Sequence, residues 1–526
     1  MPTLEWIGKD KVINHHQEVP YRVLERQYSF DESGQHSEDN GSENMIIHGD
    51  NLEALKALLP QYEGKIKCIY IDPPYNTGNE GWVYNDNVND PKIKKWLGEV
   101  VGKEGEDLSR HDKWLCMMYP RLKLLQKLLA DDGVIFISID DTEYANLKLI
   151  CDEIFKNFAE TIVWQKRTSP DARKKLSSGH EYVLIYTKSA DQNLGLKLLP
   201  LEGKDAEAYT NPDNDPRGPW ISSPFTAPGY RPNQMYQITT PTGKTILPPK
   251  GRCWCNIEEV YQRLLSEGRM WFGADGNGVP RRKTYLSERE GRGIWTWWTN
   301  SEVGYTQMAT QEVAAILGKA VFDYPKPVRL ISRIIQIASS DGDIILDSFA
   351  GSGTTAHAVL NMNKADGGHR KFILIEMMDY ADSITAERVK RVIHGYGEGK
   401  KAVEGTGGNF SYYELGPVLL QPDGNLNEEV GADKIRAYVY YMETKETLPT
   451  QQNPAEPYQM GVCRDTAYYF YYERQKVTTL DYKFLSTIQT KASGYIIYAD
   501  LCAIPQETLR KYNITFKKIP RDIARL

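Results

Sequence analysis

Residues 43–72 alternate two short apolar segments with one helical segment, and this alternation constrains the fold more than any other feature. The first apolar segment, ENMIIHGD, ends at Asp50, and NLEALKALL then repeats leucine at helical spacing. The second apolar segment, IKCIYID, runs into Pro73 and Pro74. Strand, helix, strand is the building unit of a parallel sheet. This part of the chain therefore predicts an α/β fold.

The same alternation returns after a long interruption. KPVRLISRIIQIAS is expected to be a helix, DIILD a strand, TTAHAVLNMN a helix and KFILIE a strand. Between the two parts, from about residue 190 to residue 300, short segments are broken by prolines and glycines. We therefore expect one doubly wound sheet that is formed by two outer segments and split by an inserted domain.

These patterns divide the 526 residues into five regions. The first ends in a polar stretch and is expected to be a loosely ordered arm, and the last is rich in tyrosines that we expect to be core. The predicted regions are an N-terminal arm (1–42), the first half of the sheet domain (43–189), the insertion (190–300), the second half of the sheet domain (301–404) and a small α+β C-terminal domain (405–526).

Charge is distributed unevenly along the chain. The whole chain has 64 bases against 70 acids, a net charge of −6, whereas a dedicated DNA-binding chain is usually basic. Residues 161–300, however, hold 20 bases against 14 acids, a balance of +6, which leaves −12 for the rest. This imbalance favours contact between the middle of the chain and nucleic acid phosphates.

Two basic clusters and three tryptophans in this middle region have alternative interpretations. Each cluster taken alone is as consistent with a solvated surface as with phosphate binding, and the tryptophans are expected to be buried rather than to stack on bases. The clusters are Lys166, Arg167, Arg173, Lys174 and Lys175, and Arg281, Arg282 and Lys283; the tryptophans are Trp295, Trp297 and Trp298.

Several classes of protein are disfavoured by composition. The sequence has no run of about 18 apolar residues, so we expect no membrane partner. The first residues mix acids, bases and histidines where a secretory signal needs an apolar core, which predicts a cytoplasmic protein. The seven cysteines are dispersed, and the Cys253–Cys255 pair has no second pair at zinc spacing, so no metal site is expected.

The segment IYIDPPYNTG, residues 69–78, brings an acid, two prolines and an aromatic ring to the end of an apolar strand. Ligands of open α/β sheets bind at that end. The prolines lack N–H donors, so the turn presents carbonyl acceptors beside Asp72, and Tyr75 adds a stacking face. This set suits a planar base with an exocyclic amine that must be aimed at an electrophile. An ordinary strand-ending turn is the alternative.

The segment DIILDSFAGSGTTAHAV, residues 343–359, predicts a strand, a glycine loop and a helix. Gly351 and Gly353 allow a tight turn and close approach of a ligand. The loop lacks the Gly-Lys-Ser/Thr of a Walker loop and the third glycine of the dinucleotide fingerprint. Glu376 ends the next strand 25 residues after Gly351, where an acid can hold ribose hydroxyls. We expect a nucleoside ligand without phosphate; a merely connecting loop is the alternative.

Taken together, the two motifs resemble those of the DNA amino methyltransferases. DPPY is similar to their catalytic motif and FAGSG to their S-adenosylmethionine loop, and the catalytic motif precedes the loop as in the beta class. Further matches are to the modification (Mod) subunits of Type III restriction-modification systems, over roughly residues 43–415: IIHGDNLEAL, DPPYNTGNEGWVYND, LADDGVIFISIDD, HEYVLIYTK and FDYPKPVRLI. The resemblance implies a Rossmann-like methyltransferase sheet with an inserted target-recognition domain. Asp72 stands where cytosine-N4 members tend to have Ser, which favours adenine N6.

The resemblance also implies roles for single residues. Asp72 and the carbonyl of Pro73 would hold the adenine amine beside Pro74, and Tyr75 would stack on the flipped base. In the S-adenosylmethionine site, Asp50 would meet the adenine, Glu376 the ribose, and Lys326 and Pro327 the methionine end. The cofactor pocket would be shaped by Asp347, Phe349, Ala350, Gly351, Ser352, Gly353 and Thr354. His180 and Glu181 belong to the family pattern without a chemical role that the sequence reveals.

The expected partners and the alternative functions complete the prediction. The target is double-stranded DNA with a flipped adenine, because the amine lies inside the duplex. A restriction subunit with helicase and nuclease activity and a homodimer are implied only by the resemblance. The alternatives are a cytosine-N4 methyltransferase, a DNA-binding specificity subunit that needs no catalysis, and a nucleotide-dependent oxidoreductase, which would leave the DPPY motif unexplained.

Overall fold

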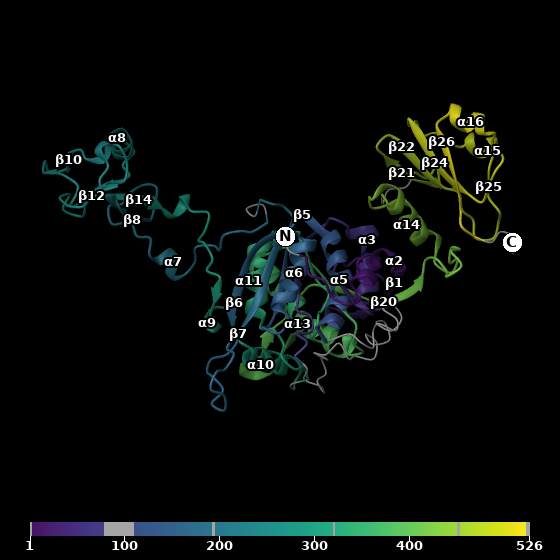
Figure 1. Cartoon of the computed structure of the whole chain (residues 1–526), viewed down its shortest axis with the longest axis horizontal. Coiled ribbons are helices and arrows are strands. Elements are labelled where there is room, and N and C mark those ends of the chain that lie inside the picture. The colour runs from purple at the N-terminus through teal and green to yellow at the C-terminus, as the bar shows by residue number, and fades with distance from the viewer. Residues whose placement is uncertain (1–2, 78–109, 192–194, 319–320, 450–452, 522–526) are drawn as a thin grey trace. The chain divides into compact units, whose positions relative to one another are not determined.

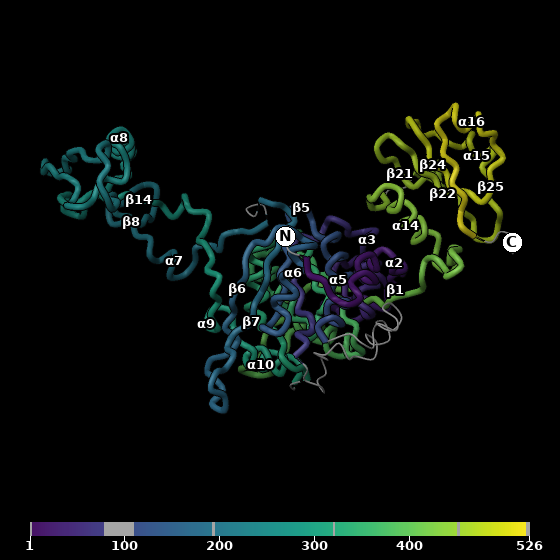
Figure 2. Tube along the Cα trace, viewed as in Figure 1, coloured from purple at the N-terminus to yellow at the C-terminus, as the bar shows by residue number. Residues whose placement is uncertain are grey.

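The computed structural model describes residues 3–77, 110–191, 195–318, 321–449 and 453–521 (Figure 1). The chain divides into two compact units: one combines Met1–Lys197 with Thr296–Leu526, and the other is Leu198–Trp295. Figure 2 traces the chain as it leaves the first unit after residue 197 and rejoins it at residue 296. None of the helices in the described ranges has the length and apolar content needed to cross a bilayer.

A mixed 11-stranded sheet runs through the described part of the first unit, in the order β15-β6-β7-β5-β4-β16-β17-β3-β20-β1-β2. The strands from β5 to β20 in this order are parallel neighbours, whereas β7 is antiparallel to β5 and to β6. The strand bounds are β1 Arg22–Asp31, β2 Gly34–His36, β3 Met45–His48, β4 Ile66–Ile71, β5 Leu129–Ile139, β6 Asn157–Gln165, β7 His180–Thr187, β15 Trp297–Trp298, β16 Ile344–Asp347, β17 Lys371–Glu376 and β20 Phe410–Val418.

The two outer segments of the sequence are interleaved in this sheet. β16 and β17 lie between β4 and β3, so the strand that carries Asp72 at its end is the direct neighbour of the strand that ends at Asp347. Ile69 is in register with Leu346, and Asp347 with Leu374, which brings the C-terminal ends of these strands to one edge. The predicted doubly wound α/β sheet, split in sequence, is confirmed, and the neighbouring strand ends define where a site can form.

Helices cover this sheet and supply its core. Ile69 and Ile71 of β4 share a core with Leu52 and Leu55 of α3 because alternate residues of a strand face one side. α3 begins after Asp50, whose carboxylate caps the helix by accepting the N–H groups of its first turn. The main helices are α3 Asn51–Tyr62, α5 Arg110–Leu128, α6 Tyr144–Ile154, α10 Thr306–Leu317, α11 Val328–Ala338, α12 Thr354–Asp366 and α13 Glu387–His394.

The unit Leu198–Trp295 has its own small core. An antiparallel sheet joins β13, β14 and β8, and Phe225 and Trp254 share a core with Tyr261 of α8. The principal bounds are β8 Trp220–Pro224, β9 Thr226–Pro228, β12 Arg252–Trp254, α8 Glu258–Ser266, β13 Met270–Trp271 and β14 Arg281–Tyr285.

The last region of the chain combines helices with a four-stranded sheet in the order β21-β22-β24-β26. The tyrosines Tyr440, Tyr468, Tyr469 and Tyr472 are buried, as expected for core residues. The bounds are α14 Ala432–Thr444, β21 Gln459–Cys463, β22 Thr466–Phe470, β24 Gly494–Ala499, α16 Gln506–Lys511 and β26 Ile514–Lys518.

Candidate active site

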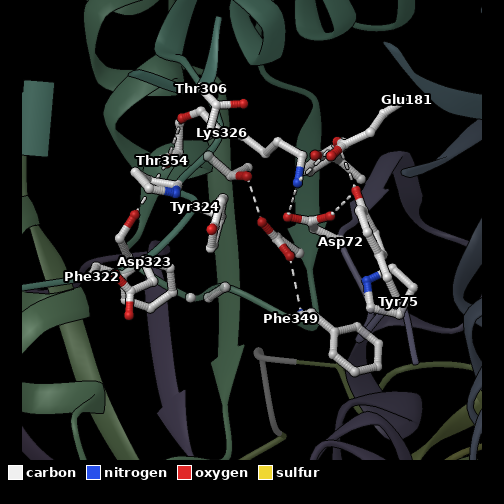
Figure 3. Close-up of a pocket in the computed structure, with 18 of the residues that line it drawn as sticks. Asp72, Tyr75, Glu181, Thr306, Phe322, Asp323, Tyr324, Lys326, Phe349 and Thr354 are labelled. Atoms are coloured by element: carbon white, nitrogen blue, oxygen red, sulfur yellow. Dashed lines mark hydrogen bonds and ion pairs between the residues drawn. The ribbon is translucent and has the colours of Figure 1, made fainter. Parts of the chain in front are cut away.

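A cavity of about 230 Å³ lies at the C-terminal ends of β4 and β16 (Figure 3). It brings together ten of the residues that the sequence singled out: Asp72, Pro73, Tyr75, Lys326, Asp347, Phe349, Ala350, Gly351, Ser352 and Thr354. Its other walls come from residues that include Tyr70, Asp140, Lys166, Glu181, Thr306, Phe322, Asp323 and Tyr324. The two motifs, some 270 residues apart in sequence, therefore share one cavity because their strands are neighbours.

Asp72 lies on the wall of this cavity directly after the buried strand β4. Its Oδ1 accepts the Tyr75 hydroxyl at 2.8 Å, and its Oδ2 accepts the Lys326 ammonium at 2.6 Å. Burial raises the pKa of the Asp72 carboxyl, and the Lys326 charge opposes this rise. The side chain thus presents hydrogen-bond acceptors at a partly buried part of the cavity wall.

Tyr75 and the preceding Pro74 are both held by hydrogen bonds. Its hydroxyl lies 2.8 Å from Asp72 Oδ1 and 3.1 Å from Glu181 Oε2. The carbonyl of Pro74 accepts the indole N–H of Trp114 at 2.7 Å, so this carbonyl already has a donor within the protein. These bonds fix the ring of Tyr75 at the cavity wall.

The glycine loop is held by carboxylates on either side. Asp347 accepts the N–H of Phe349 at 3.0 Å and the Thr355 hydroxyl at 2.5 Å. Glu376, at the end of β17, accepts the N–H of Gly351 at 2.8 Å. Burial raises the pKa of both the Asp347 and the Glu376 carboxyl groups to about 7. Both acids therefore titrate near neutral pH.

The left-handed backbone of the loop explains its glycines. Gly351 has φ 51° and Gly353 has φ 79°, a region that residues with a Cβ rarely adopt. A Cβ on Gly351 would lie 3.0 Å from the ring of Phe322. The buried guanidinium of Arg388 donates to Ser352 Oγ at 2.8 Å and to Thr354 Oγ1 at 2.9 Å. The loop is thus braced in a conformation that leaves the cavity open beside it.

The other five predicted site residues do not line this cavity: Pro74, Asp50, Pro327, Gly353 and Glu376. Asp50 caps α3 and pairs with Arg121 at 3.2 Å, Pro327 precedes α11, and Gly353 precedes α12. Glu376 lies behind the loop, where it binds Gly351.

The sequence did not predict that the polar residues Glu181 and Lys166 would lie in this site. β7 is antiparallel to β5, so its first residues lie at the edge where the parallel strands end. Lys166 follows β6, which ends at the same edge, and its ammonium lies 3.0 Å from Glu181 Oε1. The motif HEYVLIYTK was a signal for Glu181, but its position depends on a strand order that the sequence does not state.

The structure corrects two expectations about the middle region. Trp295 is 81% exposed and Trp297 is 50% exposed, so the prediction that these two are buried is wrong; Trp298 is buried. Lys166 is turned into the cavity, where it pairs with Glu181. Lys283 is 4% exposed and binds the carboxylates of Asp213 and Asp215. These two lysines are therefore occupied within the protein rather than presented to phosphates.

Replacing Lys283 by methionine should destabilise the unit Leu198–Trp295 by about 2 kcal/mol, because buried carboxylate oxygens lose their charged donor. The loss stays moderate because Asp215 keeps its bonds to Arg217 and Tyr285. Urea unfolding of Lys283→Met measures this loss of stability. Arg282→Met is the matched control, since Arg282 is exposed on the same strand. Equal stability of both variants would contradict the structural role of Lys283.

Residues 66–387 match the family model of the DNA methylases, which is more than half of the chain. The chain therefore belongs to the DNA methylase family. This membership agrees with the shared cavity of the DPPY motif and the glycine loop.

Curated relatives include Mod subunits of Type III restriction-modification enzymes and a Type II methyltransferase. The Mod subunit of the Type III restriction-modification enzyme StyLTI from Salmonella typhimurium is 37% identical over 68% of this chain and 58% of the relative. The EcoP15I Mod subunit from Escherichia coli is 31% identical over 75% of this chain and 66% of the relative. The Type II methyltransferase M.KpnI from Klebsiella pneumoniae is 34% identical over 66% of this chain and 84% of the relative. The matches thus span less than two thirds of either Mod subunit.

Proposed function

We propose that the chain transfers the methyl group of S-adenosylmethionine to the N6 amine of adenine at a specific sequence in duplex DNA. The observation that carries this proposal is the position of Asp72 in one cavity with the glycine loop at Asp347 to Thr354. An amine held at Asp72 and a cofactor held at the loop would be direct neighbours. Family membership and the similarity to Mod subunits and Type II methyltransferases support the same reaction.

The residues of the glycine loop fit a nucleoside cofactor. Gly351 brings left-handed backbone to the cavity wall, and Phe322 and Phe349 supply apolar surface. Glu376 would accept ribose hydroxyls from beside the loop, where its carboxylate accepts the N–H of Gly351. Asp347 and Thr354 border the cavity on the same side. S-adenosylmethionine supplies a methyl group on a sulfonium, which an uncharged amine can attack directly.

The catalytic contribution of the chain is positioning. Asp72 accepts an N–H of the target amine and aims its nitrogen, while Tyr75 supports the plane of the flipped base. The low-dielectric wall around Asp72 strengthens this hydrogen bond relative to the same bond in water. No covalent bond between the chain and the base is needed.

Cofactor affinity should weaken about tenfold between pH 8 and pH 6, because the pKa of the buried Glu376 is about 7. Ribose hydroxyls donate to the ionised carboxylate, which is present above pH 7 and becomes protonated as the pH falls. Calorimetric titration of the full chain with S-adenosylmethionine at both pH values measures the change. Glu376→Gln should reduce this pH dependence to the part that the Asp347 carboxyl contributes, since its pKa is also about 7. A wild-type affinity that is equal at pH 6 and pH 8 would contradict the assignment.

We propose that the unit Leu198–Trp295 contributes to target recognition, since it is a compact unit with exposed basic residues and is inserted in sequence between the two halves of the sheet domain. A restriction subunit as partner follows from the similarity to Mod subunits, and a homodimer remains a prediction. The main alternative is methylation of cytosine at N4, because cytosine also carries an exocyclic amine that could donate a hydrogen bond to Asp72.

Expression in a host that lacks DNA methyltransferases tests the proposal. The host DNA is then sequenced with detection of modified bases. We expect N6-methyladenine in one recurring sequence and none in a host that carries the empty vector. N4-methylcytosine would establish the alternative, and unmodified DNA despite accumulation of the folded chain would contradict both.

A further inference from the structure

Two carboxylates, the buried Glu181 and the partly buried Asp72, face the buried ammonium of Lys326 in the cavity (Figure 3). Lys326 Nζ lies 2.6 Å from Asp72 Oδ2 and 3.6 Å from Glu181 Oε2. The other oxygen of Glu181 accepts the Lys166 ammonium at 3.0 Å. The proposed function uses Asp72 and leaves this arrangement of charges unexplained.

The ammonium of Lys326 occupies the position that a target base needs. It donates to the Oδ2 oxygen of Asp72, which the amine of the base must reach. It also lies over the Tyr75 ring, 5.0 Å from the ring centroid, on a face where the base would stack. A base that binds this oxygen and this face of the ring would displace the ammonium.

Glu181 offers the ammonium a partner within the cavity. The Lys326 side chain is buried. If its ammonium moved away from Asp72 and met no other carboxylate, it would be an unpaired charge in a low-dielectric site. Burial disfavours the charged form of Glu181, but Lys326 and Lys166 outweigh it and lower the pKa of the carboxyl. Glu181 is therefore ionised, and a small movement of the ammonium exchanges one carboxylate for the other.

We propose that Lys326 holds the acceptor of Asp72 before the target base enters, and that Glu181 is the positioning residue that receives the ammonium when the base displaces it. The inference rests on the proposed function, since the target amine is the displacing group. Glu181 can stay bonded to the Tyr75 hydroxyl while the ammonium moves, because its Oε2 already lies 3.1 Å from that hydroxyl. The other charged residues in the described cavity wall are Lys166, Asp347, Asp140 and Asp323. Lys166 pairs with Glu181, and Asp347 accepts the Thr355 hydroxyl.

The test compares variants of the full chain in methyl transfer from labelled S-adenosylmethionine to genomic DNA of a methyltransferase-free host. Glu181→Gln keeps an oxygen for Tyr75 but removes the charge, so the single-turnover rate should fall about 100-fold with cofactor affinity unchanged. Asp141→Asn is the matched control, because the exposed Asp141 carboxylate binds Tyr182, the next residue of β7, outside the cavity.

The double variant Glu181→Gln with Lys326→Met distinguishes a receiver of the ammonium from a structural residue. Removing the ammonium makes its receiver unnecessary, so the double variant should be at least about tenfold faster than Glu181→Gln alone. A double variant that is slower than Glu181→Gln, or a Glu181→Gln rate equal to that of the wild type, would overturn the inference. Loss of cofactor binding in Lys326→Met would assign the ammonium to the cofactor and also overturn it. A wild type that transfers no label would instead contradict the proposed function.

Discussion

The variant Asp72→Ala should lose methyl transfer by at least about 1000-fold while it still binds S-adenosylmethionine. Asp72 supplies the acceptor at the end of β4, and the alanine leaves the amine of the base without a partner that aims it. The variant should fold, because Lys326 lies within 3.6 Å of Glu181 and keeps a carboxylate as its neighbour.

The measurement combines single-turnover transfer to DNA with calorimetric titration of the cofactor. Asp141→Ala is the control for the loss of a carboxylate, since Asp141 is exposed and does not line the cavity. Retention of more than one tenth of the wild-type rate in Asp72→Ala would show that Asp72 does not position the amine.

The second large effect is expected at the start of α12. Gly353→Ala should weaken S-adenosylmethionine binding on the order of 100-fold, because φ is 79° and the new Cβ would lie 3.1 Å from the carbonyl oxygen of Thr385. The Thr385 hydroxyl donates to the Gly351 carbonyl at 2.6 Å, so pushing Thr385 away also moves the loop that borders the cavity.

Gly367, at the other end of α12, provides the matched control. It also has a positive φ, 69°, but a Cβ there meets nothing within 4 Å. Gly367→Ala should therefore cost about 1 kcal/mol of unfolding free energy and leave cofactor affinity unchanged. Equal cofactor affinities of the two variants would contradict the role of the loop at Gly353.

The sequence predicts the sheet and the two strand ends well, because these depend on local patterns. A hydrophobic run followed by DPPY or by a glycine loop can be recognised within about ten residues. Ligands of parallel sheets bind at the C-terminal ends of the strands. The insertion of β16 and β17 between β4 and β3 depends on the packing of the whole sheet, which no local pattern states.

The parts of the site that escaped prediction come from strands that run the opposite way or from long-range pairing. Glu181 lies 106 residues from Tyr75 and reaches the cavity only because β7 is antiparallel to β5. Lys283 stands in a basic run, yet its two carboxylate partners lie about 70 residues away in sequence, so composition alone suggests a free cation. The exposure of Trp295 likewise depends on how the ends of the insertion pack.

The most direct test of the central claim uses the purified full chain with mixed-sequence duplex DNA and methyl-labelled S-adenosylmethionine. The DNA is digested to nucleosides, and the labelled species is identified by chromatography. We expect the label in N6-methyladenine for the wild type and no label for Asp72→Ala. A wild type that binds neither cofactor nor DNA, or that binds both and leaves every nucleoside unlabelled, would contradict the assignment of the cavity to methyl transfer.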